Sequence, residues 1–319
     1  MSILEFISKK IRALVSHEVK SCFCDYDIRI RRLLSSQNEN LLFGIESSKL
    51  TERTLNSTNY GITTDKICQN EVVVSLTSYG KRLNDVYIPI ESIMQGSVKP
   101  NRIILWLAEE ELGKQLPVTL QKQQKRGLDI RYCKDIKSYK KLIPTLKEFP
   151  EACIVTIDDD VIYQFDLLEN LLLSYNNYPN YIHANRVHTI SLDNHGLPLP
   201  YNEWQCCSTI GNNSILNFAT GVGGILYPPN SLDKRVFDET TFMSICPTAD
   251  DIWFFAMAHL NGFNTCKSFS RDSTGNDFLE NPSVQDVALK QINKIVNCKN
   301  DIQLTAVIKK YNLTLNEKI

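Results

Sequence analysis

The 319-residue chain lacks several features that would place it in a class at once. It has no run of 18 apolar residues, so its sequence predicts no membrane-spanning helix. It has no signal-peptide pattern, and its ten cysteines do not form paired Cys-x-x-Cys zinc spacings. We therefore expect a cytoplasmic protein with reduced cysteines. The formal net charge is −1, so we expect no nucleic-acid partner attracted by an overall positive field.

Two phosphate-binding fingerprints are also missing. No Gly-x-Gly-x-x-Gly follows the first predicted strand, and no Gly-x-x-x-x-Gly-Lys-Ser/Thr is present. These absences argue against a dinucleotide-dependent dehydrogenase and a P-loop nucleotidase. Any phosphate group would have to be held by a metal ion and by lysine or arginine side chains.

The main part of the chain alternates between apolar runs and helical patterns. With 43% hydrophobic and 22% charged residues, the composition is that of a soluble globular protein. Predicted strands cover residues 72–77, 102–107, 128–133, 153–157 and 181–186. Predicted helices lie between them, with interruptions near Pro117 and Pro144. Strands that alternate with helices indicate βαβ units, so we predict an α/β fold with a mostly parallel sheet.

The two ends of the chain differ from this central part. Residues 1–35 carry seven Lys/Arg against four Asp/Glu, a balance of +3, with apolar residues at helical spacing. They predict an amphipathic helix for packing, self-association or weak peripheral contact with a membrane. Residues 36–68 read as a polar linker. The predicted division is 1–68 as an N-terminal helical extension and linker, 69–270 as the catalytic domain, and 271–319 as a mostly helical tail packed on it.

Three aspartates end the fourth predicted strand. Asp158, Asp159 and Asp160 follow the apolar run of residues 153–157. In open α/β sheets, ligands bind beyond the carboxyl ends of the strands. Three adjacent like charges are tolerated when they face water, cap a helix or hold a cation. Mg²⁺ and Mn²⁺ prefer oxygen ligands and often link carboxylates to substrate phosphates, so this position is a candidate metal site.

A second acidic pair opens an apolar helix. Asp250 and Asp251 follow Thr248, which could cap that helix. Acidic residues are favoured there by the helix dipole without any further role. Asp251 stands three residues after Thr248, close to capping-box spacing, which would leave Asp250 free to face the crevice.

These segments together resemble the GT-A-fold glycosyltransferases, in particular bacterial enzymes that build capsular or lipopolysaccharide glycans. The matching segments lie between residues 71 and 268 and do not include residues 1–68. They are Val74–Tyr79, Lys140–Pro144, Ile157–Asp160, Thr220–Gly224 and Ala249–Trp253.

The resemblance implies a GT-A fold, a nucleotide-sugar donor (a UDP-sugar) and Mn²⁺ or Mg²⁺. It implies that Asp158 and Asp160 bind the metal and that Asp250 or Asp251 serves as the base beside a glycan or lipid-linked acceptor. The nucleotide sugar would be bound by Thr77, Tyr79, Arg82, Asp135, Lys141, Asp158 and Asp159.

Two other functions fit the same pattern. A nucleotidyltransferase that makes nucleotide sugars would use a similar fold and a metal. It would need a glycine-rich basic loop after the first strand, where residues 78–82 contain one glycine. A catalytically inactive glycan-binding protein could keep the fold, although acidic motifs at both expected positions argue against it.

Overall fold

The computed structural model describes residues 37–206, 208, 211–269, 277–283 and 299–315. The chain divides into two units, Met1–Ile45 and Glu46–Ile319, and the fold described here is that of the second. The amphipathic helix predicted for residues 1–35 lies outside the described residues. No helix within the described parts of the chain is long and apolar enough to cross a membrane.

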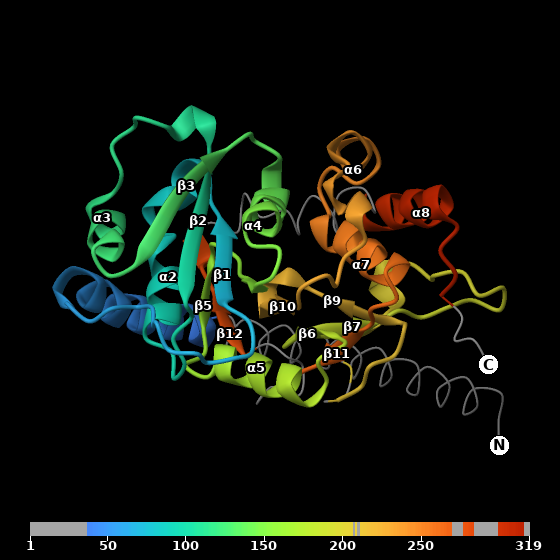
Figure 1. Ribbon diagram of the computed structural model, residues 1–319, viewed down its shortest axis with the longest axis horizontal. Coiled ribbons are helices and arrows are strands. Elements are labelled where there is room, and N and C mark those ends of the chain that lie inside the picture. The colour runs from blue at the N-terminus through green and yellow to red at the C-terminus, as the bar shows by residue number, and fades with distance from the viewer. Residues whose placement is uncertain (1–36, 207, 209–210, 270–276, 284–298, 316–319) are drawn as a thin grey trace, which may run out of the picture. The chain divides into compact units, whose positions relative to one another are not determined.

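A seven-stranded sheet forms the centre of the fold (Figure 1). Neighbouring strands are parallel except at β10, which runs antiparallel to both β4 and β6. The strands in spatial order are β11 (Thr265–Lys267), β6 (Ile182–Ala184), β10 (Ile225–Tyr227), β4 (Cys153–Thr156), β1 (Val72–Thr77), β2 (Arg102–Ala108) and β3 (Leu128–Cys133).

Helices cover both faces of this sheet, so its central strands are buried on both sides. Along β1, Val73 packs into one hydrophobic cluster while Val72 and Val74 pack into the other. This alternation follows from the two-residue period of a strand, and it explains why β1 reads as a continuous apolar run. The predicted α/β class, with a mostly parallel sheet flanked by helices, is confirmed.

Helices in the described part of the main unit include α2 (Tyr87–Met94), α3 (Val118–Gln124), α4 (Ile143–Glu148), α5 (Leu167–Asn177), α6 (Glu239–Ile245), α7 (Asp250–Leu260) and α8 (Lys299–Tyr311). Both predicted interruptions are present. Pro117 is the N-cap of α3, and Pro144 stands in the first turn of α4 behind the 3₁₀ segment η3 (Lys137–Lys141). Pro is tolerated in a first helical turn because the N–H that it lacks would have no partner there.

The second half of the chain contains more strand than we predicted. Beyond the predicted strands, β8 (Gln205–Cys206) joins β7 (Val187–Thr189) and β9 (Asn217–Ala219) in a small antiparallel sheet. The tail, predicted as mostly helical, contains β12 (Phe278–Glu280), which pairs with β5 (Val161–Tyr163). Short edge pairings of this kind depend on the partner strand, so the tail sequence alone does not indicate them.

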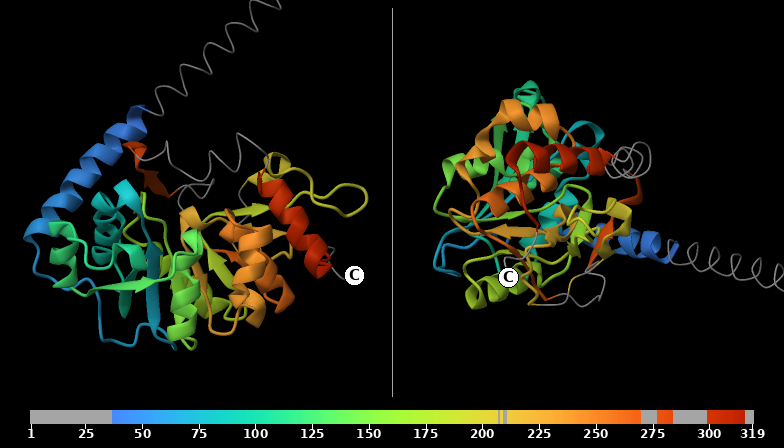
Figure 2. Two further views of the ribbon diagram at one scale, coloured as in Figure 1. Left: turned by 90° about the horizontal axis from the view of Figure 1, so that it is seen from above. Right: turned by 90° about the vertical axis from the view of Figure 1, so that its right-hand side faces the viewer.

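Within the described part of the tail, residues 299–311 form helix α8. Helix α8 packs beside α7 and α6 (Figure 2). Its Leu304 and Val307 are buried in the same core cluster as Trp253 of α7. The predicted domain boundaries at 68/69 and 270/271 remain predictions.

The predicted linker is partly wrong, because residues 37–56 are helical. Within the second unit, the Thr54 hydroxyl donates to Glu91 over 3.1 Å, and Thr51 is hydrogen-bonded to Tyr87. Glu91 is fully buried and paired with Arg126, whose two guanidinium nitrogens lie 2.8 and 3.0 Å from its carboxylate oxygens. A buried charge needs all its hydrogen bonds. The Thr54 hydroxyl of this helix completes the network, and Leu50 of the same helix is buried.

Candidate functional site

The turn after β1 is tied to the aspartates after β4. Asp159 is buried and accepts hydrogen bonds from Ser78 Oγ and Arg82, each at 2.6 Å. Arg82 also reaches Asp160 over 3.1 Å. Because β1 and β4 are adjacent and parallel, their carboxyl ends leave the sheet at the same edge. Arg82, in the 3₁₀ segment η1 (Gly80–Asn84), thus holds two of the three aspartates.

Lys141 joins the strand-end aspartates to those of α7. Its Nζ donates to Asp158 Oδ1 at 3.0 Å and lies 3.0 Å from Asp250 Oδ2. The second contact has the distance of an ion pair but not the geometry of a hydrogen bond. Burial lowers the pKa of Lys141, but Asp158, Asp250 and Asp251 outweigh it and raise this pKa well above its usual value. Lys141 is therefore protonated, and it connects two acidic motifs that are far apart in the sequence.

The groups described so far form an acidic cluster, which consists of Asp158, Asp159, Asp160, Asp250 and Asp251 with the two cations Arg82 and Lys141. Gly221 lies against this acidic cluster. It lies in the 3₁₀ segment η5 (Gly221–Gly223), between β9 and β10, and its N–H donates to Asp251 Oδ2 at 2.9 Å. A Cβ at this position would lie 2.7 Å from Lys141 Nζ and 3.0 Å from Asp251 Oδ1. A side chain at this position would have to displace the Lys141 ammonium, so the site favours glycine.

The cluster carries an excess of negative charge. Asp158, Asp159, Asp160, Asp250 and Asp251 face two cations, Arg82 and Lys141, which leaves three uncompensated charges if every group is ionised. Burial raises the pKa of Asp160 to about 7, and the charge of Asp158 adds to the effect against the opposing Arg82. Burial also raises the pKa of Asp251 to about 7, although Lys141 opposes it. Both carboxylates would gain from an added cation.

The carboxylate oxygens of these aspartates fit a divalent ion that also binds a substrate. Among the described residues, no group of three His, Cys, Asp or Glu side chains is arranged to hold a metal by itself. Mg²⁺, however, is usually held by one or two carboxylates together with substrate phosphates and water. Asp158 is 29% exposed and Asp160 is 13% exposed, so both retain some access. In addition, Asp251 Oδ1 is buried without a hydrogen-bond partner.

The other predicted nucleotide-binding residues are arranged differently. Thr77 donates its hydroxyl to the Trp106 carbonyl at 2.8 Å, a contact within the sheet. Tyr79 is half exposed, with its ring centre 5.7 Å from the Arg82 guanidinium. The described contacts of Asp135 go to the Lys137 N–H and to Lys140, not to the acidic cluster. The cluster therefore includes Arg82, Lys141 and the three strand-end aspartates of the predicted set, but its described contacts do not include Thr77 or Asp135.

The capping argument for Asp251 is wrong. The N-cap of α7 is Ala249, and it makes no side-chain capping bond. The Thr248 N–H donates to Gln303 of α8 at 2.9 Å, while the Asp251 carboxylate accepts from Gly221. Thr248 and Asp251 are thus hydrogen-bonded to residues that are distant in the sequence and not to each other. A local sequence pattern cannot predict such partners.

Sequence reasoning missed the roles of Ser78 and Gly221. Both lie in segments that carried the resemblance, and the glycines of residues 220–224 were a signal for close backbone approach. His183 is buried in β6. Its Nδ1 lies 2.8 Å from Ser174 Oγ and its Nε2 lies 3.0 Å from the Tyr178 carbonyl.

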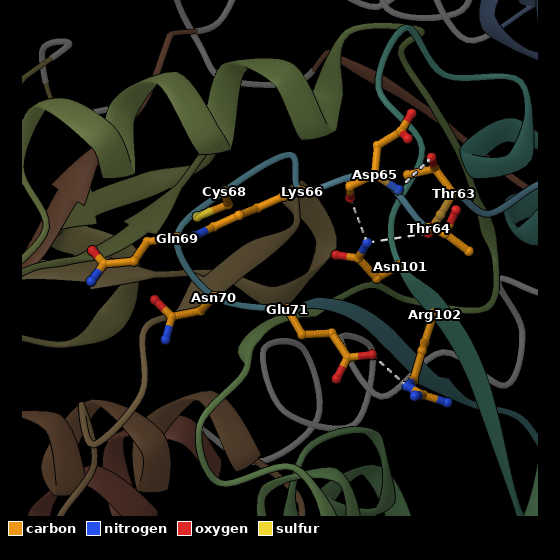
Figure 3. A pocket seen from close by; sticks show the side chains of 10 residues that line it. All are labelled: Thr63, Thr64, Asp65, Lys66, Cys68, Gln69, Asn70, Glu71, Asn101 and Arg102. Atoms are coloured by element: carbon orange, nitrogen blue, oxygen red, sulfur yellow. Dashed lines mark hydrogen bonds and ion pairs between the residues drawn. The ribbon is translucent and has the colours of Figure 1, made fainter.

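A separate hollow of about 410 Å³ lies near the amino ends of β1 and β2 (Figure 3). Its lining includes Asn101, whose amide donates to the carbonyls of Thr63 and Asp65. It also includes the ion pair of Glu71 and Arg102, at 2.6 Å. Ligands of open α/β sheets bind at the opposite, carboxyl edge, and none of the predicted site residues lines this hollow.

No protein-family model matches the chain, and no curated protein sequence matches it. Solved structures do resemble it at low identity. An inositol-1-phosphate CTP transferase from T. maritima is 10% identical with a TM-score of 0.41, covering 75% of this chain and 96% of that one. Residues 1–349 of S. aureus TarS are 12% identical with a TM-score of 0.44, covering 76% and 71%. A CMP:2-keto-3-deoxy-manno-octonic acid synthetase, complexed with CTP, is 12% identical with a TM-score of 0.37, covering 71% and 99%.

Proposed function

We propose that this chain is a metal-dependent glycosyltransferase that moves a sugar from a nucleotide sugar, a UDP-sugar, to a glycan or lipid-linked acceptor. The observation that carries the proposal is the position of Lys141, 3.0 Å from both Asp158 and Asp250. It brings the carboxylates after β4 and those of α7 into one site at the carboxyl edge of the sheet. A metal-dependent, inverting glycosyl transfer would use both groups, one to hold the cation beside the leaving diphosphate and one as the base beside the acceptor hydroxyl.

On the donor side, Asp158 and Asp160 would hold the divalent cation. Such an ion supplies Lewis-acid stabilisation of the diphosphate as it leaves. Arg82, which we predicted to contact the nucleotide, has its guanidinium engaged by Asp159 and Asp160. We therefore assign Arg82 and Asp159 to positioning the metal-binding aspartates, and Tyr79, half exposed beside Arg82, to the nucleotide.

On the acceptor side, one carboxylate of α7 would take the proton of the attacking hydroxyl. A general base works best when its pKa is near the working pH. Burial raises the pKa of Asp251 to about 7. Asp250 is paired with Lys141 instead. We therefore prefer Asp251 as the base, in place of the Asp250 favoured by the capping argument.

A thermal-shift screen of nucleotides and nucleotide sugars, each with and without Mn²⁺, tests this function. A ligand that binds only the folded protein raises its unfolding temperature. We expect a UDP-sugar to do so in the presence of Mn²⁺ and to lose the effect with a chelator. If no nucleoside diphosphate or nucleotide sugar shifts the transition, the proposed function is wrong. Pyrophosphate release from a nucleoside triphosphate, without sugar transfer, would identify a nucleotidyltransferase.

The proposed setting is the cytoplasm, where nucleotide sugars would be the donors and a surface polysaccharide precursor the acceptor. The predicted membrane contact or self-association through residues 1–35 lies outside the described residues. It remains part of the proposal only as a sequence-based prediction.

A further inference from the structure

Lys141 occupies an unusual place for a lysine. Its side chain is 8% exposed, and its ammonium group lies between carboxylates that come from two different elements, the loop after β4 and the first turn of α7. On a third side it meets the backbone of Gly221, where even a Cβ atom would approach to 2.7 Å. The ammonium therefore has little room to move away on that side.

The adjacent lysine provides a natural comparison. Lys140 is also buried, with 4% of its side chain exposed, and it lies on the same 3₁₀ segment. Its partner is Asp135, which is 52% exposed and is not among the described contacts of the acidic cluster. Lys141 thus forms its ion pairs inside the acidic cluster, whereas Lys140 forms its ion pair with a more exposed carboxylate outside it.

We propose that Lys141 is a positioning residue that acts as an internal cation. In the metal-free protein it holds Asp158 and Asp250 together, and it releases Asp158 to the divalent ion when the donor binds. The inference rests on the proposed function, and it concerns a residue that the sequence predicted only as a contact of the nucleotide sugar.

The physical argument is competition for one carboxylate. Lys141 donates a hydrogen bond to Asp158, a proposed metal ligand, so a divalent ion at Asp158 must weaken or displace that bond. The two cations would also repel each other at this short range in a partly buried site. The diphosphate of a nucleotide brings negative charge that would balance both the divalent ion and the Lys141 ammonium. The metal should therefore bind weakly alone and much more tightly together with the nucleotide.

This arrangement predicts reciprocal coupling between the two ligands. If the nucleotide raises the affinity for Mn²⁺, then Mn²⁺ raises the affinity for the nucleotide by the same factor. Lys141 would be the source of part of this coupling. When Asp158 binds the metal, Lys141 would keep its ion pair with Asp250. It would thereby hold the α7 carboxylate in place while the nucleotide sugar and the metal bind.

Calorimetric titration of Mn²⁺ alone into the full chain tests the proposal. Lys141→Met keeps the apolar stem and removes the charge, and Lys140→Met is the matched control. We expect Lys141→Met to bind Mn²⁺ about tenfold more tightly than the unmodified protein, which corresponds to ~1.4 kcal/mol. Lys140→Met should bind as the unmodified protein does. Equal affinities in Lys141→Met and the unmodified protein, or an equal gain in both variants, would overturn the proposal.

A second pair of variants covers the case in which Lys141→Met does not fold without metal. The double variant Lys141→Met/Asp250→Asn removes one charge of each sign, and Asp250→Asn alone is its reference. Tighter Mn²⁺ binding by the double variant supports the proposal, and equal binding contradicts it. Since these titrations contain no nucleotide, they are separable from the proposed function, which fails if the unmodified protein does not bind UDP with Mn²⁺.

Discussion

The main-chain N–H of Gly221 donates to the Asp251 carboxylate over 2.9 Å, which connects the loop between β9 and β10 to the first turn of α7. The same glycine leaves no room for a side chain beside Lys141. One backbone position therefore lies against both halves of the candidate site, close to Asp158 and to Asp251. The stability and the ligand binding of the protein should both depend on it.

Gly221→Ala tests this role. The added methyl group would lie 2.7 Å from Lys141 Nζ, so the loop or the lysine must shift. We expect a loss of unfolding free energy of ~1–3 kcal/mol, the usual cost of overpacking, together with loss of sugar transfer. Urea denaturation and a transfer assay measure the two effects. Gly44→Ala is the control, since a Cβ there meets nothing within 4 Å. A fully stable and active Gly221→Ala would contradict the role.

Asp160→Ala tests the metal site. Burial and the neighbouring charge of Asp158 raise the pKa of Asp160, so removing this carboxylate relieves repulsion and the fold should survive. Metal-dependent UDP binding should be lost, because a proposed ligand of the cation is gone. Calorimetry with UDP and Mn²⁺ measures the affinity, and circular dichroism checks the fold. Unchanged affinity would remove Asp160 from the metal site.

Asp251→Asn tests the base. The amide keeps an acceptor oxygen for the Gly221 N–H but cannot take a proton at neutral pH. We expect sugar transfer to fall by ~100-fold or more while UDP-sugar and Mn²⁺ still bind, since proton transfer by a positioned group typically contributes that much. Asp250→Asn is the companion variant. If Asp250→Asn loses transfer and Asp251→Asn does not, the base is Asp250.

His183 should make stability depend on pH. Burial lowers its pKa from 6.5 to about 4 in the folded protein. As pH falls below 6.5, the unfolded chain gains a proton that the folded protein does not bind until about pH 4. The unfolding free energy should therefore fall over this window, by ~3 kcal/mol in total from this residue, and be unaffected by it above pH 6.5.

Urea denaturation between pH 7 and pH 4 measures this dependence in the unmodified protein and in His183→Gln. We expect the variant to be less stable at neutral pH, because the hydrogen bonds of the His183 imidazole to Ser174 and to the Tyr178 carbonyl are lost. The difference between the two proteins should shrink as pH falls. A constant difference would show that His183 does not titrate as stated.

The sequence by itself determined the fold class and the position of the first acidic motif. Periodicity is a local property, so the buried runs at β1, β2 and β4 and the helices between them could be predicted. In a parallel sheet the carboxyl ends of the strands lie at one edge. That β1 and β4 are neighbours, which brings Arg82 to Asp159, was decided by the structure. The interruptions of the helical pattern near Pro117 and Pro144 followed equally from proline chemistry.

Tertiary structure alone decided how the site is assembled. The antiparallel insertion of β10 brings Gly221 against Lys141 and Asp251, and no local pattern encodes that contact. Thr248 bonds to Gln303 of α8 rather than to Asp251, because a partner from the distant tail was available. Short-range patterns fix dihedral preferences and buried faces. The partner of a given carboxylate is set by which elements pack together, and that depends on the whole chain.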